Sequence, residues 1–215
     1  MAYTVKEIYY TLQGEGAQVG RPAVFLRFSG CNLWSGQEKD RHKGPGGCSQ
    51  WCDTNFLGTD GHNGGKFSKV DELADTVLAQ WPSVPSSTRP LVVCTGGEPL
   101  LQLDDELLVA LRRRGFSVAA ETNGTVAPPD GPLWLTVSPK ANAPLKLTRG
   151  NELKLVFPQV GAEPERFAHL DFSYFYLQPL DGPSRVENTG LALEYCLRHP
   201  QWRLSVQMHK VVGIP

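Results

Sequence analysis

Short apolar segments of strand length recur along the chain, and they are the feature that most limits its fold. They cover residues 3–9, 22–28, 91–94, 116–120, 133–137, 153–157, 174–177 and 202–206. Side chains along a strand alternate between its two faces, so Phe25 and Arg27 are expected to point away from Val24 and its apolar partners. A chain with this pattern is expected to build its core around a β-sheet.

Three segments show the periodicity of an amphipathic helix, at residues 68–81, 104–114 and 186–198. Ser68 is the expected N-cap of the first helix, and Gly115 is expected to end the second. Several strands follow one another with no room for a helix, so the helices are too few for a complete eight-fold βα barrel. The pattern predicts an α/β fold, a partial TIM-like barrel with few helices, formed by residues 1–215 as a single domain.

The charges of the chain nearly cancel, with 21 Lys and Arg against 22 Asp and Glu and a formal net charge of −1. This balance does not favour nucleic acid or an anionic membrane as a partner, so a small ligand is expected. The first residues lack the basic flank and apolar core of a leader, and no run approaches the roughly 18 apolar residues of a membrane span. A cytoplasmic protein is predicted.

Most of the apolar segments end in a burst of polar or glycine residues. The bursts are SGCN after Phe28, TGGEP after Cys94, ETNGT after Ala120, SPK after Val137, QPLDG after Leu177 and QMHK after Val206. Loops are polar in most proteins, but loops at the carboxyl ends of parallel strands also gather on one rim, where ligand sites form. A large cavity lined by polar groups is predicted at this rim.

Three of the five cysteines, Cys31, Cys48 and Cys52, fall close together in one loop region. Three thiolates are one ligand short of a closed structural zinc or iron-sulfur site. His42 or His62 could complete a zinc site, a catalytic zinc could keep three protein ligands, or a [4Fe-4S] cluster could leave one iron open. Spacing alone does not separate these alternatives, and the remaining Cys94 and Cys196 lie in apolar patterns typical of inert core residues.

The TGGEP segment favours a ligand with an amino group. A Gly-Gly turn directly after an apolar strand lets a ligand approach the backbone closely, and Glu98 beside it offers an anionic acceptor for an ammonium group. A phosphate would instead need donors and a lysine. These features suit an amino acid moiety.

At this point the chain resembles the radical S-adenosylmethionine (SAM) enzymes, and among them the 7-carboxy-7-deazaguanine synthase family. The motifs that carry the resemblance stand in the family's order along almost the whole chain. They include EIYYTLQGEGAQVGRPAVFLRFSGCNLWSG, WCDTNF, GTDGHNGGKF, VVCTGGEPLLQLD, ETNGT, VSPKANAPL, GNELKLV, LQPLDGPSR and WRLSVQMHK.

The resemblance implies a lyase that converts 6-carboxy-5,6,7,8-tetrahydropterin to 7-carboxy-7-deazaguanine with loss of ammonia, in queuosine biosynthesis. It implies that Cys31, Cys48 and Cys52 ligate a [4Fe-4S] cluster whose fourth iron is chelated by SAM. The cofactors would supply the radical chemistry, while the protein orients and shields it.

The resemblance also assigns residues to each ligand. It implies that SAM is bound by Trp51, Cys52, Asp53, Gly97, Glu98, Ser138, Pro139, Lys140, Gln178, Pro179, Leu180 and Asp181. It implies that the pterin is bound by Leu12, Gln13, Gly14, Arg27, Thr95, Glu121, Asn123 and Pro215. Arg27 is the natural partner of the substrate carboxylate, and Glu121 can accept from the guanidine-like edge of the pterin.

Four further expectations come from the family. Mg²⁺ is expected at Thr54, whose hydroxyl is a hard oxygen ligand of the kind this ion prefers. The carboxylate of Pro215 is expected to reach the substrate. A homodimer and an external, flavodoxin-like electron donor are also expected.

The chain departs from the family pattern between Cys48 and Cys52, where three residues stand instead of two. GPGG before Cys48 is expected to give the backbone freedom that this change needs, and residues 38–43 are expected to form a solvated insertion. Leu180 and Met208 are minor departures. Two alternative functions are an activating enzyme that acts on a protein partner and a zinc-stabilised binding module without catalysis.

Overall fold

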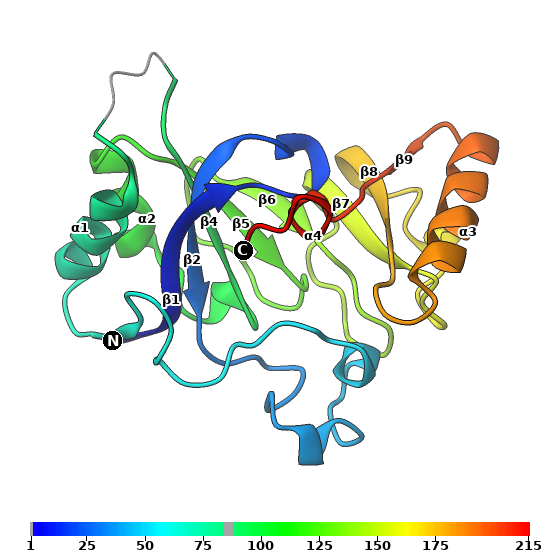
Figure 1. Cartoon of the computed structure of the whole chain (residues 1–215), viewed down its shortest axis with the longest axis horizontal. Helices are drawn as coiled ribbons and strands as arrows, with labels where there is room; N and C mark the ends of the chain where they lie inside the picture. The colour runs from blue at the N-terminus through cyan, green and yellow to red at the C-terminus, as the bar shows by residue number, and fades with distance from the viewer. Residues whose placement is uncertain (1, 84–87) are drawn as a thin grey trace.

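The computed structural model describes residues 2–83 and 88–215; Met1 and residues 84–87, which belong to the single domain expected for residues 1–215, lie outside the described part. The framework is one nine-stranded sheet with the order β3-β1-β2-β4-β5-β6-β7-β8-β9 (Figure 1). The strands are β1 (Tyr3–Leu12), β2 (Pro22–Phe28), β3 (Gly65–Phe67), β4 (Leu91–Gly96), β5 (Ser117–Thr122), β6 (Trp134–Val137), β7 (Arg149–Phe157), β8 (Asp171–Pro179) and β9 (Trp202–Leu204).

The sheet is parallel except at one end. β1 runs antiparallel to β2 and β3, and every other pairing, from β2 across to β9, is parallel. β3 and β9 are the two edges of the sheet and do not pair with each other, so the barrel stays open. The predicted α/β fold, a partial TIM-like barrel, is confirmed.

Four α-helices accompany the sheet, α1 (Val70–Gln80), α2 (Asp105–Arg113), α3 (Arg185–Arg198) and the short α4 (Met208–Val212). Figure 1 shows α1 and α2 together near β1 and β2, while α3 lies at the far end beside β8 and β9. Asp104 caps α2 by accepting a hydrogen bond from the Leu107 N–H at 2.9 Å. Gly115, with φ of +91°, follows α2 as expected. Within the described ranges, no helix is both long and apolar enough to span a membrane.

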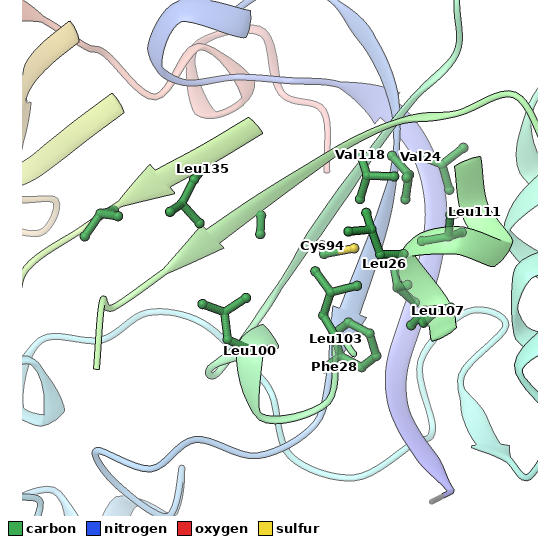
Figure 2. Packing of buried hydrophobic residues seen from close by; sticks show 14 of the residues in the cluster. Val24, Leu26, Phe28, Cys94, Leu100, Leu103, Leu107, Leu111, Val118 and Leu135 are labelled. Carbon is green, nitrogen blue, oxygen red and sulfur yellow. The ribbon is translucent and has the colours of Figure 1, made fainter. Parts of the chain in front are cut away.

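The alternation predicted for residues 22–28 is present in β2. Val24, Leu26 and Phe28 are fully buried in the main core, where Figure 2 shows them around Cys94. Burial raises the pKa of the Cys94 thiol to about 12, so Cys94 is an inert core residue, as predicted. Cys196 is half-buried at the edge of the same core.

Two local predictions were wrong. Ser68 does not cap α1, because Lys69 occupies the N-cap position and no side chain caps the helix there. QMHK was expected to be a rim loop, and α4 begins within it at Met208. The glycine-rich stretch near residue 65 includes β3, which gains its order from pairing with β1. Tertiary contacts therefore outweigh the local signal of short segments.

The packing of the core predicts that substitutions at two nearby positions of α2 have very different effects on stability. Leu107 is fully buried, so Leu107→Ala should lower the free energy of unfolding by about 2–5 kcal/mol through lost contacts and a residual cavity. Val109 is 43% exposed, and Val109→Ala should cost less than about 1 kcal/mol. Urea denaturation followed by circular dichroism measures both, and equal losses would contradict the assignment of α2's buried face.

Candidate functional site

A cavity of about 470 Å³ opens at the carboxyl ends of the parallel strands. The strand residues that face it alternate with core residues: Arg27 on β2, Thr95 on β4 and Glu121 on β5 line the cavity, while Leu26, Cys94 and Ala120 are buried in the main core. Arg27 and Thr95 are direct partners in the β2–β4 register. Because side chains alternate between the two faces of each strand, these strands place polar groups in the cavity and apolar groups in the core.

Most residues assigned to ligands by the sequence line this cavity. They are the substrate set Leu12, Gln13, Gly14, Arg27, Thr95, Glu121, Asn123 and Pro215, the cofactor set Trp51, Cys52, Asp53, Gly97, Ser138, Lys140 and Gln178, and Cys31, Cys48 and Thr54. Pro179, Leu180 and Asp181 line an adjoining pocket that shares Trp51, Asp53 and Gln178 with the first. Glu98 and Pro139 line neither.

The unusual spacing of the last two cysteines is accommodated by a helical turn. A 3₁₀ helix covers Gly47–Gln50, and the Cys52 N–H donates to the Cys48 carbonyl at 2.8 Å. This is the i to i+4 bond of an α-helical turn, which places residues four apart on the same side. Three intervening residues therefore bring Cys48 and Cys52 to the same wall of the cavity.

The glycines before Cys48 act through close packing and not, as expected, through conformational freedom. Gly44, Gly46 and Gly47 all have ordinary negative φ values. A Cβ atom on Gly44 would lie 2.6 Å from the Leu33 carbonyl oxygen, which is too close for any side chain. The Gly47 N–H donates to the Ala141 carbonyl at 2.8 Å, which anchors the start of the turn.

The three thiols lie in a secluded environment. Cys31 and Cys52 are half-buried and Cys48 is buried. Burial raises the pKa of the Cys48 thiol to about 11, against the opposing effect of the Lys140 ammonium. The Leu33 N–H donates to the Cys31 sulfur at 3.4 Å. Burial also raises the pKa of the Cys31 thiol, so the neutral thiols of Cys31 and Cys48 are favoured until a positively charged centre replaces their protons.

The described residues contain no ready-made site for a single metal ion, since no three His, Cys, Asp or Glu side chains are grouped for one. Two buried polar atoms among the cavity-lining residues also have no hydrogen-bond partner, the Trp34 Nε1 donor and the Gln178 Oε1 acceptor. Buried polar atoms are seldom left unpaired. Three cysteine sulfur atoms and two unpaired polar atoms thus line one cavity. This combination fits an iron-sulfur cluster that carries a polar ligand.

An ion network in the wall of the cavity ties three segments together. The Lys154 ammonium on β7 forms ion pairs with Glu15 and, at 3.3 Å, with Glu121. The Gln13 side-chain amide donates to the same Glu121 oxygen at 3.0 Å. The two carboxylates raise the pKa of Lys154 and outweigh its burial. Sequence reasoning missed Glu15 and Lys154, although a lysine inside the apolar run ELKLV was a usable signal.

Another buried carboxylate holds the loop that contains Gln13 and Glu15. Glu152 on β7 accepts from the Ala17 N–H at 2.7 Å and from the Trp134 indole at 2.5 Å. Gly16 has φ of +66°, and Glu152 Oε2 lies 2.2 Å from the position its Cβ would occupy. Only glycine fits this position, which explains the second glycine of GEG.

The C-terminal segment crosses the mouth of the site. Lys210 on α4 forms ion pairs of 2.6 Å with both Asp53, next to Cys52, and Asp181, after β8. Its pKa is raised by these two carboxylates. The Thr11 hydroxyl donates to the Pro215 carbonyl at 3.0 Å. Lys210 was not predicted, because the ion pairs join segments far apart in sequence.

Comparisons with known proteins place this geometry in a family. The chain is 63% identical over 215 residues to the 7-carboxy-7-deazaguanine synthase of Caulobacter vibrioides and 59% identical to that of Bordetella pertussis, each alignment covering all of both chains. The enzyme of the same name from Escherichia coli is 32% identical, again over the full length of both. The chain belongs to the 7-carboxy-7-deazaguanine synthase family.

The structural comparison agrees with this family. The crystal structure of QueE from Escherichia coli superposes with a TM-score of 0.70 at 29% identity, covering 97% of this chain and 95% of that one. No protein-family model matches the chain. The predicted resemblance to the 7-carboxy-7-deazaguanine synthase family is thus confirmed, and with it the prediction of an enzyme.

One residue of the family's glycine motif has a structural role that the sequence did not predict. The Glu98 side chain is fully buried, and its carboxylate accepts from the Leu100 N–H, the Thr122 hydroxyl and the Asn123 N–H at 2.7–3.0 Å. Oε1 accepts two of these bonds and Oε2 accepts one, so the expected role of Glu98 as an ammonium acceptor stays a prediction. The structure shows that Glu98 joins the glycine turn after β4 to the end of β5.

This arrangement predicts the effect of an isosteric change. Glu98→Gln should lower the free energy of unfolding by about 1–3 kcal/mol, because an amide has one acceptor oxygen and its NH₂ must face either the Leu100 or the Asn123 N–H. Glu106→Gln, on the exposed face of α2, is the matched control and should have almost no effect. Urea denaturation measures the difference, and a Glu98→Gln protein as stable as the control would refute the three-bond description.

Proposed function

We propose that the chain is a radical SAM lyase that converts 6-carboxy-5,6,7,8-tetrahydropterin to 7-carboxy-7-deazaguanine with loss of ammonia, a step of queuosine biosynthesis. The observation that carries the proposal is that three thiols share one cavity with the side chains assigned to the pterin. Family membership supports the same reaction.

Cys31, Cys48 and Cys52 would hold a [4Fe-4S] cluster, with SAM completing the ligands of the fourth iron. When bound, these groups supply the organic radical that starts the reaction. The backbone of Gly97, the amide of Gln178 and the ammonium of Lys140 are the cavity groups proposed to hold SAM. Lys140 lies 2.9 Å from the Ser138 carbonyl, and its ammonium stands 5.8 Å from the centre of the Trp51 ring.

The charges around the cavity suit ligands that carry both signs. Its lining includes the carboxylates Glu7, Glu15, Asp53 and Glu121 and the cations Arg27, Lys140, Lys154 and Lys210. SAM carries an ammonium, a sulfonium and a carboxylate, and the pterin carries a carboxylate and a guanidine-like edge. A balanced lining can pair with each of these groups without leaving a buried charge alone.

Arg27 is proposed to bind the substrate carboxylate. Its Nε donates to Glu7 at 2.8 Å and its Nη2 donates to Tyr9 at 2.9 Å, which fixes the plane of the guanidinium. Of its five N–H groups, these contacts commit two, so others stay available for a bidentate carboxylate. Glu121, which pairs with Lys154 at 3.3 Å, is proposed as the acceptor for the N–H groups of the pterin.

The proposal also covers a magnesium ion, the protein partners, the domain organisation and the cellular compartment. Thr54 would ligate Mg²⁺ together with the substrate carboxylate, and its place in the cavity lining supports this. An external flavodoxin-like protein would supply electrons, and two copies would form a homodimer. We also propose that residues 1–215 form one radical SAM domain and that the protein acts in the cytoplasm.

Anaerobic reconstitution with iron and sulfide tests the main proposal. The protein should turn brown, cleave SAM when reduced, and give a product whose mass shows loss of ammonia from the carboxy-tetrahydropterin. The Cys31→Ala protein is the control and should remain unable to cleave SAM. A colourless protein with stoichiometric zinc would refute the radical reaction, and SAM cleavage without deazapurine would point to an activating enzyme.

Thr54 gives a separate prediction about magnesium. Thr54→Ala should reduce the stimulation of turnover by Mg²⁺ by at least about tenfold, because an oxygen that binds the ion is lost. The visible spectrum of the cluster should not change. Thr54→Ser keeps the hydroxyl and should restore most of the stimulation; if Thr54→Ala responds to Mg²⁺ like the unaltered enzyme, Thr54 is not a ligand.

A further inference from the structure

Residues 38–43, predicted to be a solvated insertion, are in fact tied to the cysteine turn through one side chain. Arg41 Nη1 donates to the Ser49 carbonyl at 2.9 Å and to the Cys52 carbonyl at 3.1 Å. In return, the Ser49 hydroxyl donates to the Arg41 carbonyl at 2.6 Å. Three hydrogen bonds thus join the insertion to the turn that carries Cys48 and Cys52.

The Arg41 guanidinium is held in place on its other side as well. Its Nε and Nη2 donate to the two carboxylate oxygens of Glu38 at 2.6 and 2.7 Å, a bidentate pair that fixes the plane of the fork. The same group lies over the Trp34 ring at 4.9 Å, and Trp34 packs edge-on against Phe56. Only 25% of the Arg41 side chain is exposed.

These contacts leave Arg41 little capacity to bind a ligand. Of the five N–H groups of a guanidinium, four are committed to Glu38, Ser49 and Cys52. A cation that serves a substrate or an anionic partner protein needs free donors. The geometry is that of a structural clamp.

The cysteine turn needs such a clamp because its own hydrogen bonds secure only one half of it. The Cys48 carbonyl accepts from the Trp51 and Cys52 N–H groups. The carbonyls of Ser49 and Cys52 come at the end of the turn, where no further helical N–H is available. Among the described residues, Arg41 is the donor that satisfies both.

We propose that Arg41 is a positioning residue that fixes the Cys48–Cys52 turn, so that both thiols face the cavity despite the three residues between them. The inference rests on the proposed function, since the purpose of the fixed turn is to hold the cluster. Arg41 does this by bridging two carbonyls of the turn and bracing them against Glu38 and Trp34. Lysine cannot replace it fully, because a single ammonium lacks the planar fork.

The first test uses the full-length protein without a cluster, so it does not depend on the proposed function. Hydrogen exchange is measured by mass spectrometry on peptides that cover residues 48–52. These peptides include the Trp51 and Cys52 N–H groups, which are protected by their hydrogen bonds to the Cys48 carbonyl. Arg41→Met should raise the exchange rate about tenfold, because charge-assisted bonds to the turn are lost. Lys43→Met is the matched control: the Lys43 side chain is 74% exposed and, among the described residues, pairs with Asp40 alone, at 3.4 Å. Exchange in the Lys43→Met protein should equal that of the unaltered protein.

The second test uses the reconstituted protein and measures bleaching of the cluster by a chelator. Arg41→Met should lose iron about tenfold faster than the unaltered protein, Arg41→Lys should be intermediate, and Lys43→Met should match the unaltered protein. If the Arg41→Met protein does not fold, the Arg41→Lys protein takes its place in both tests. Arg41→Met with unaltered exchange and unaltered iron retention would overturn the inference. If the unaltered protein binds no iron, the proposed function fails, while the exchange test still decides the role of Arg41.

Discussion

The two-residue repeat of the parallel strands is the constraint on which the rest of the structure depends. On β2, β4 and β5, one set of side chains builds the apolar core and the alternate set faces the cavity. Because the strands are in register, Arg27 and Thr95 become neighbours without any contact of their own to bring them together. A shift of one residue in β2 or β5 would move a charge into the core and an apolar side chain into the site.

Buried carboxylates then hold the loops that the strands leave irregular. Glu98 fastens the glycine turn to β5, Glu152 fastens the loop around Gly16 to β7, and Glu15 fastens the same loop to Lys154. Each carboxylate has several donors, which offsets its desolvation and makes its bonds directional. The cavity is thus shaped by a few internal anchors, one of which, Glu15, also lines it.

The sequence was sufficient to predict the features that depend on local pattern. The facing of Phe25 and Arg27 follows from strand period, and the end of α2 at Gly115 follows from helix-ending chemistry. The shared cavity of the three thiols follows from their closeness in the sequence. The features it could not predict depend on contacts between distant segments. The inward carboxylate of Glu98 is explained only by Thr122 and Asn123, the order of β3 only by pairing with β1, and the clamp by Arg41 only by the fold of the cysteine turn.

The bridge made by Lys210 has a consequence for how the protein is synthesised. Asp53 and Asp181 leave the ribosome well before Lys210, which follows Asp181 by 29 residues in the chain. Until Lys210 is synthesised, no ion pair can link Asp53 to Asp181. The contact that joins the cysteine turn to the end of β8 is therefore among the last that the growing chain can make.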